Sequence, residues 1–221
     1  MQRAKEIIFG DTKIADREHG LDNLLILTLN DKNGSSLKER VVISHLGIKS
    51  RENTKHGADG WMPDGRPVEY KPETYYEGLE SSCLTGGANF NDLTVKKHKE
   101  HITTNLLMIV AGFYEENLLY LLKFPYRVIA PSVEDRMTNT IKENQGRSDG
   151  KSSRITPRFS FADYRNYRDV ERVFLRKNIF CFSNSMNNAL RDYIGGEFPC
   201  GNKSLPIPTK SLLWFYDNAA K

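Results

Sequence analysis

Two carboxylates and a lysine, Asp59, Glu69 and Lys71, lie within a short segment that has the composition of a β-hairpin. The tripeptide Pro63-Asp64-Gly65 between them favours a three-residue loop, because proline presets φ and glycine takes the left-handed conformation. With this loop Asp59 lies directly opposite Glu69, and residues in such a cross-strand pair point to the same face, with Cβ atoms about 5 Å apart. Lys71 shares that face because strand side chains alternate.

This set of groups points to metal-assisted hydrolysis of a phosphodiester. Two carboxylates held close together repel each other unless a cation lies between them, and paired carboxylate oxygens suit Mg²⁺. The neighbouring Lys71 can orient or deprotonate a water molecule. The alternative is a solvent-facing hairpin with an ordinary cluster of charges, but such a hairpin gives no reason for two like charges to face each other.

The rest of the chain predicts a mixture of helices and strands. Helices are expected over residues 13–29, 36–46, 132–144, 164–174 and 186–193, and strands over 106–113, 118–124, 155–161 and 179–182. The second strand of the hairpin is expected to stop at Pro72, and residues 73–92 to be irregular. This order predicts an α/β fold with one central mixed β-sheet flanked by helices.

The order of Asp59, a hairpin and then Glu69-Tyr70-Lys71 on a strand resembles the PD-(D/E)xK nuclease superfamily, and most closely a compact type II restriction endonuclease. The family's proline before the aspartate is Ala58 here, at a position whose side chain is not a ligand. An E-x-K triplet alone is expected about once by chance in a chain of this length, so the hairpin context carries the resemblance.

The resemblance implies a restriction-endonuclease-like fold and a role for each motif residue. Asp59 would be the bridging metal ligand, Glu69 the second ligand, and the backbone carbonyl of Tyr70 would complete the inner shell around Mg²⁺. Lys71 would position the attacking water and offset the charge that grows on the transition state.

Glu39 is a candidate fourth acid of the site, because helix 36–46 lies where the family has a helix that can carry a further acid. The sequence Ser36-Leu37-Lys38-Glu39 is equally typical of a capping box, in which Glu39 only caps its helix. The two interpretations remain open.

The implied partners are double-stranded DNA and a second copy of the chain, because two-fold symmetry matches a palindromic site. Residues 147–177 hold nine Lys/Arg against four acids, and four cations there are candidate DNA contacts: Arg147, Lys151, Arg154 and Arg158. His98 and His101, in a lysine-rich stretch, either contact the DNA backbone or face solvent. Two alternatives are a structure-specific repair, resolvase or phage nuclease of the same fold, and a DNA-binding module without cleavage.

Length and composition are those of one domain. The chain has 221 residues and a formal net charge of +4, so we expect a single nuclease domain over 1–221, with a catalytic core at about 36–125 and recognition and dimerisation elements in 126–221. The three cysteines form no C-x-x-C pair, and no apolar run is long enough to span a bilayer. The first residues lack the features of a signal peptide, which predicts a cytoplasmic location.

Overall fold

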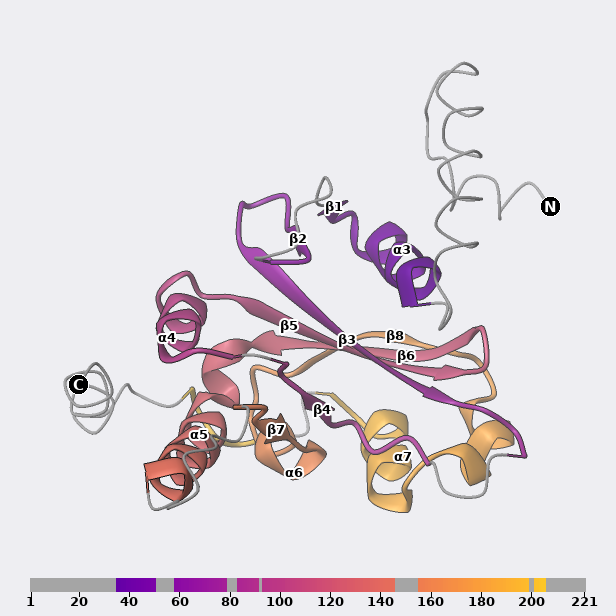
Figure 1. The fold of residues 1–221 in the computed structure, drawn as a ribbon. Helices are drawn as coiled ribbons and strands as arrows, with labels where there is room; N and C mark the ends of the chain where they lie inside the picture. The colour runs from indigo at the N-terminus through magenta and orange to yellow at the C-terminus, as the bar shows by residue number, and fades with distance from the viewer. Residues whose placement is uncertain are drawn as a thin grey trace.

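A mixed six-stranded sheet forms the centre of the fold (Figure 1). The structure is a computed structural model that describes residues 35–50, 58–78, 83–91, 93–145, 155–198 and 201–205. The strand order is β1 (Lys49–Ser50), β2 (Gly60–Trp61), β3 (Pro67–Tyr75), β5 (Leu107–Tyr114), β6 (Asn117–Pro125) and β8 (Glu171–Leu175). The β3 and β5 strands are parallel, and all other neighbours in this sheet are antiparallel. The prediction of an α/β fold with a mixed central sheet is confirmed.

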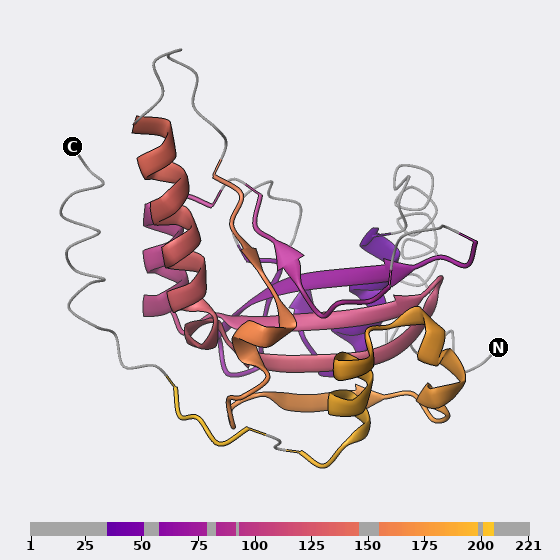
Figure 2. The ribbon, with the colours of Figure 1, turned by 90° about the horizontal axis from the view of Figure 1, so that it is seen from below.

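Helices cover both faces of this sheet (Figures 1 and 2). One face packs against α3 (Ser35–Leu46), whereas the other packs against α4 (Val95–Thr103), α5 (Ala130–Gln145), α6 (Phe161–Tyr164) and α7 (Asn188–Gly195). Two short strands, β4 (Ala88–Asn89) and β7 (Arg158–Phe159), form a separate antiparallel pair. None of the helices in the described part of the chain is long and apolar enough to cross a bilayer.

The β5 strand explains why the sequence of this region is continuously apolar. Leu107, Ile109 and Ala111 pack into the core beneath α3, while Met108 and Val110 pack into the larger core on the opposite face. A strand that is buried on both faces needs apolar side chains at every position. Its parallel neighbour β3 is reached through the crossover helix α4, which fixes α4 beside the hairpin.

The predicted helix at 164–174 is wrong, because α6 ends at Tyr164 and β8 occupies Glu171–Leu175. The β8 strand pairs with the buried strand β6, and this long-range pairing overrides the local helical pattern. The predicted strand at 179–182 is also wrong. These residues lie in a 3₁₀ helix, η2 (Ile179–Ser185), which follows the left-handed residue Asn178 (φ 63°).

The predicted strand end at Pro72 is wrong as well, because β3 continues to Tyr75. The amide N–H of Asp59 donates to the Val68 carbonyl (2.8 Å), and that of Tyr70 donates to the Asp59 carboxylate (2.6 Å). Val68 and Tyr70 therefore direct their backbone groups toward the β2 side of β3. Pro72 is the next residue in this alternation, so its nitrogen points to the same side. Since the paired residues of β2 end opposite Val68, the missing N–H of Pro72 interrupts no ladder bond.

The expected helix at 13–29 lies outside the described residues. The helix expected at 186–193 is confirmed as α7, and the helix expected at 132–144 is confirmed as α5. Both strands expected after the motif are present as β5 and β6. Of the strand expected at 155–161, the structure retains only the two residues of β7.

Candidate active site

The hairpin turn forms as predicted and fixes the register of β2 and β3. The N–H of Met62 donates to the Arg66 carbonyl (2.9 Å), and Gly65 takes a left-handed φ of 84°. Gly60 then pairs with Val68. The Asp64 carboxylate accepts hydrogen bonds from the Arg66 backbone N–H (3.1 Å) and Nε (2.8 Å), which lowers the pKa of Asp64. Asp64 therefore stabilises the turn, as the sequence predicts.

Glu69 and Lys71 form an ion pair on one face of β3. The Lys71 Nζ lies 2.7 Å from Glu69 Oε1, and the two side chains are only 17% and 16% exposed. The same ammonium lies 4.8 Å from the centre of the Phe90 ring, which gives it a second favourable contact. The prediction that these two residues share a face of the strand is confirmed.

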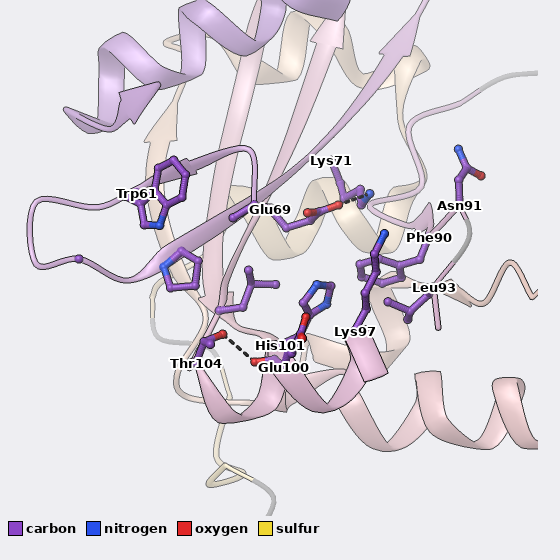
Figure 3. Close-up of a pocket in the computed structure, with 14 residues that line it drawn as sticks. Trp61, Glu69, Lys71, Phe90, Asn91, Leu93, Lys97, Glu100, His101 and Thr104 are labelled. Atoms are coloured by element: carbon purple, nitrogen blue, oxygen red, sulfur yellow. Dashed lines mark hydrogen bonds and ion pairs between the residues drawn. The ribbon is translucent and has the colours of Figure 1, made fainter. Parts of the chain in front are cut away.

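This pair lines a cleft of about 500 Å³ between the hairpin, the segment around Phe90, and α4. Figure 3 shows Trp61 on the hairpin side, Lys97 and His101 rising from α4, and the Glu69–Lys71 pair between them. The lining residues are Ala58, Trp61, Gly65, Pro67, Glu69, Lys71, Phe90, Asn91, Leu93, Lys97, Glu100, His101, Thr104 and Leu106. A concave site with a few convergent polar groups is where ligands bind most often.

Asp59 does not lie directly across from Glu69 as expected. Its N–H donates to the carbonyl of Val68, the residue that already pairs with Gly60, so the regular pairing ends before Asp59. The Asp59 carboxylate then occupies the place of the next backbone partner and accepts the N–H of Tyr70 (2.6 Å). This places the carboxylate at the edge of β3, on the side to which the backbone groups of Tyr70 point.

Asp59, Tyr70 and Glu39 line a small cavity beneath α3, on the opposite face of the sheet from the cleft. The Tyr70 side chain is 8% exposed, and its hydroxyl has no hydrogen-bond partner among the described residues. Burial raises the pKa of Tyr70, and the charges of Glu39 and Asp59 raise it further. The four predicted site residues therefore form two pairs, Glu69 with Lys71 and Asp59 with Glu39.

The position of Glu39 bears on its two interpretations. Glu39 is the fifth residue of α3 as the structure describes it, Ser35–Leu46. Glu39 also lines the cavity that Asp59 lines, and its two interpretations, accessory acid and helix cap, both remain predictions.

Glu73 was missed, although it continues the alternation of Glu69 and Lys71 along β3. Its carboxylate accepts hydrogen bonds from the Thr85 N–H, the Thr85 hydroxyl and the Gly86 N–H, each at 2.8 Å. Burial raises the pKa of Glu73 despite these bonds. The residue anchors the segment that leads to Phe90, which forms one wall of the cleft. The i, i+2, i+4 spacing could have identified it if the strand had not been predicted to end at Pro72.

Glu73→Ala should lower the free energy of unfolding by about 2–3 kcal/mol, because it leaves the N–H groups of Thr85 and Gly86 without their acceptor. Chemical denaturation measures this loss. The exposed Glu116→Ala is the matched control and should change the free energy by less than about 0.5 kcal/mol. Equal stability of the two variants would show that the carboxylate does not anchor this segment.

The two histidines of α4 are not on its solvent-exposed face. His98 is fully buried, with Nδ1 2.7 Å from the Tyr126 hydroxyl and Nε2 3.9 Å from Glu134 Oε2. The prediction that it contacts DNA or faces solvent is therefore wrong. His101 lines the cleft, packs against the Tyr126 ring, and has a buried Nδ1 without a hydrogen-bond partner among the described residues. Burial lowers the pKa of both, to about 4 for His98.

His98 should make stability depend on pH. Its folded pKa lies below the unfolded value near 6.5, so the unfolded chain binds more protons and stability falls as pH decreases from about 6.5 toward 4. The contribution lost between pH 7 and pH 5 is about 2 kcal/mol. We expect denaturation curves of His98→Gln to show a smaller loss over this range than those of the wild type. An identical pH dependence of the two proteins would contradict the assignment.

Of the four predicted DNA contacts, Arg147, Lys151 and Arg154 lie outside the described residues. Arg158 is exposed on β7, and its backbone carbonyl accepts a hydrogen bond from the Arg136 guanidinium. Arg136 in turn pairs with Asp163 at 3.0 Å, which ties α5 to α6. The backbone of Arg158 is thus tied to α5, whereas its side chain is exposed.

Mg²⁺ is the ion that the motif implies, and it prefers hard oxygen ligands. In the described ranges no three His, Cys, Asp or Glu side chains gather around one point. Mg²⁺ is usually bound by one or two carboxylates, with waters and substrate phosphate completing its octahedron. Glu69 supplies one such carboxylate in the cleft, whereas Asp59 lines the cavity beneath α3, so the described donors that the motif implies lie on two faces of the sheet.

Comparison of the sequence with models of known protein families and with curated proteins gave no match.

Proposed function

We propose that this protein is a Mg²⁺-dependent endonuclease that hydrolyses double-stranded DNA, of the type II restriction kind and with a restriction-endonuclease-like fold. The observation that carries the proposal is the ion pair of Glu69 and Lys71, which is largely buried and yet lines an open cleft. A concave site with a few convergent polar groups is the usual place for a ligand, and a carboxylate beside an ammonium can act there on a bound phosphate.

The arrangement of elements supports the same proposal. The α3 helix precedes the hairpin, the motif lies on β3, and the strands β5 and β6 follow after the α4 crossover. This is the order that the resemblance to PD-(D/E)xK nucleases leads us to expect. The proposed partners are duplex DNA and a second copy of the chain, since a palindromic site requires two cleavage centres.

Each residue has a definite task in this proposal. Glu69 would hold Mg²⁺ from the cleft, and Asp59 with the carbonyl of Tyr70 would complete its ligands only after the Asp59 carboxylate turns from the cavity beneath α3 toward the cleft. Bound Mg²⁺ would supply Lewis-acid polarisation of the scissile phosphate and acidify a bound water. Lys71, oriented by Glu69, donates hydrogen bonds to the attacking water and to the oxygens on which negative charge grows. The Phe90 ring beneath the ammonium limits the positions that Lys71 can take.

The proposal is tested by incubating the full chain with long unmodified duplex DNA, in Mg²⁺ and in EDTA. Discrete fragments that appear only with Mg²⁺ are the expected result. Cleavage confined to branched or mismatched substrates would instead assign the site to a structure-specific nuclease. Binding without cleavage in any substrate would indicate a DNA-binding module and would contradict the proposal.

A further inference from the structure

We propose that the cleft beside Glu69 and Lys71 receives one unpaired nucleotide of the DNA strand, with its base against Trp61 and a phosphate at Lys97. This inference rests on the proposed function and adds that the strand next to the cleavage centre leaves its base pair. It is carried by Trp61, by the position of Lys97 and by the size of the cleft.

Trp61 supplies a surface on which a base can stack. It lies on β2, lines the cleft, and is 40% exposed, although a tryptophan side chain is usually well covered. Its partner across the strand pair is Pro67, and Figure 3 shows its ring beside the space above α4. Stacking on an exposed aromatic side chain does not depend on base identity and contributes substantially to single-strand binding.

Lys97 is the cation of the cleft that remains available for a phosphate. Lys71 is already paired with Glu69, whereas no carboxylate in the described ranges lies within 4.0 Å of the Lys97 ammonium. Figure 3 shows the Lys97 side chain extending from α4 toward the Glu69–Lys71 pair. The lining also contains Glu100, so Lys97 is the cation at which a phosphate is expected.

His101 gives the cleft a polar group that lacks a protein partner. Its Nδ1 is buried and makes no hydrogen bond to any described residue, and its ring lies between Lys97 and Thr104 on α4 (Figure 3). Buried polar atoms are nearly always satisfied, so this unpaired nitrogen, on a residue that lines the cleft, indicates a water or a ligand that reaches it. Burial lowers the pKa of His101, which keeps the ring neutral and able to accept or donate at a base edge.

The size of the cleft distinguishes an unpaired nucleotide from an intact base pair. A volume of about 500 Å³ lies in the range of sites that enclose a small organic ligand. The major groove of a duplex is by itself about 12 Å wide, so duplex DNA can only lie across the opening. A nucleotide that enters must therefore leave the stack, as it does in enzymes that act on flipped bases.

The experiment uses the two tryptophans of the chain, Trp61 and Trp214, in complementary variants. In Trp214→Phe the only indole is Trp61, and a 12-nucleotide oligothymidylate should quench its fluorescence saturably, more strongly than the matched duplex does. In Trp61→Phe the only indole is Trp214, and quenching should be absent. Equal quenching by single strand and duplex, or none in Trp214→Phe, would overturn the inference. If Trp214→Phe does not fold, the difference between wild type and Trp61→Phe gives the same signal.

The lysine is tested in the same assay. Lys97→Met should weaken binding of the oligothymidylate about three- to tenfold. It should also reduce the slope of the logarithm of the binding constant against the logarithm of salt concentration by about 0.7. The exposed Lys96→Met, one residue away on α4, is the control and should leave both unchanged. Equal effects of the two variants would remove Lys97 from the cleft contact.

Cleavage by the same proteins separates this inference from the nuclease proposal. Mg²⁺-dependent cleavage of duplex DNA without quenching of Trp61 would overturn the nucleotide cleft alone. Saturable quenching by the oligothymidylate without cleavage of any DNA would overturn the nuclease proposal and support the cleft as a nucleotide site.

Discussion

Glu69→Gln should reduce Mg²⁺-dependent DNA cleavage by about 10³-fold while DNA binding in EDTA remains within about threefold of the wild type. The substitution keeps the shape of the side chain and removes one negative charge from the cleft. It also releases Lys71, whose ammonium lies 2.7 Å from Glu69 Oε1, so both the metal ligand and the orientation of the water-binding group are lost. Single-turnover cleavage and a gel-shift titration measure the two effects.

The matched control for this variant is Glu116→Gln, which makes the same chemical change on the exposed turn between β5 and β6. Its cleavage rate should equal that of the wild type. The Glu69–Lys71 pair is largely buried, so Glu69→Gln leaves the Lys71 ammonium without its carboxylate partner, and thermal melting checks that the inactive variant is folded. Wild-type cleavage by Glu69→Gln would remove Glu69 from the site.

Asp59→Asn should lower the cleavage rate by about 10²-fold or more with little change in stability. The amide oxygen of asparagine can still accept the N–H of Tyr70, which the Asp59 carboxylate accepts at 2.6 Å, so the edge of β3 is preserved. What is lost is the negative charge beside the Tyr70 amide. Cleavage rate and melting temperature together separate the loss of charge from a loss of structure.

Asp64→Asn, five residues further on, provides the comparison. Asp64 lies on the turn and contacts only the Arg66 backbone and guanidinium, so this variant should cleave DNA at nearly the wild-type rate. If Asp59→Asn and Asp64→Asn are equally active, the Asp59 carboxylate has no part in the chemistry.

Local patterns predicted the hairpin and the Glu69–Lys71 pair, because turn type and strand alternation are set by neighbouring residues. Pro63–Gly65 form the expected loop, and the register from Gly60 to Arg66 follows from it. The position of Asp59 did not follow, because strand pairing ends one residue earlier and its carboxylate takes a backbone hydrogen bond instead. Where strand pairing ends depends on which side-chain and backbone groups compete for the same hydrogen bond. The spacing of residues in the sequence does not reveal that competition.

Contacts between distant segments account for most of what the sequence left undetermined. His101 and Lys97 reach the cleft only because the crossover places α4 beside the hairpin, and Glu73 meets Thr85 only because β3 continues past Pro72. The strand β8 depends on pairing with β6, some 50 residues away in the sequence. The lysines around the two histidines of α4 suggested an exposed position. The face of the helix that carries both histidines packs against Tyr126 instead.

The most direct test of the central claim is the single-turnover cleavage rate of duplex DNA as a function of Mg²⁺ concentration, for the wild type and Glu69→Gln side by side. We predict a wild-type rate that rises with Mg²⁺ to saturation and disappears in EDTA, and a Glu69→Gln rate about 10³-fold lower at saturating Mg²⁺. A wild-type rate that is independent of Mg²⁺, or equal rates of the two proteins across the titration, would contradict the assignment of Glu69 and Lys71 as the centre of a metal-dependent nuclease.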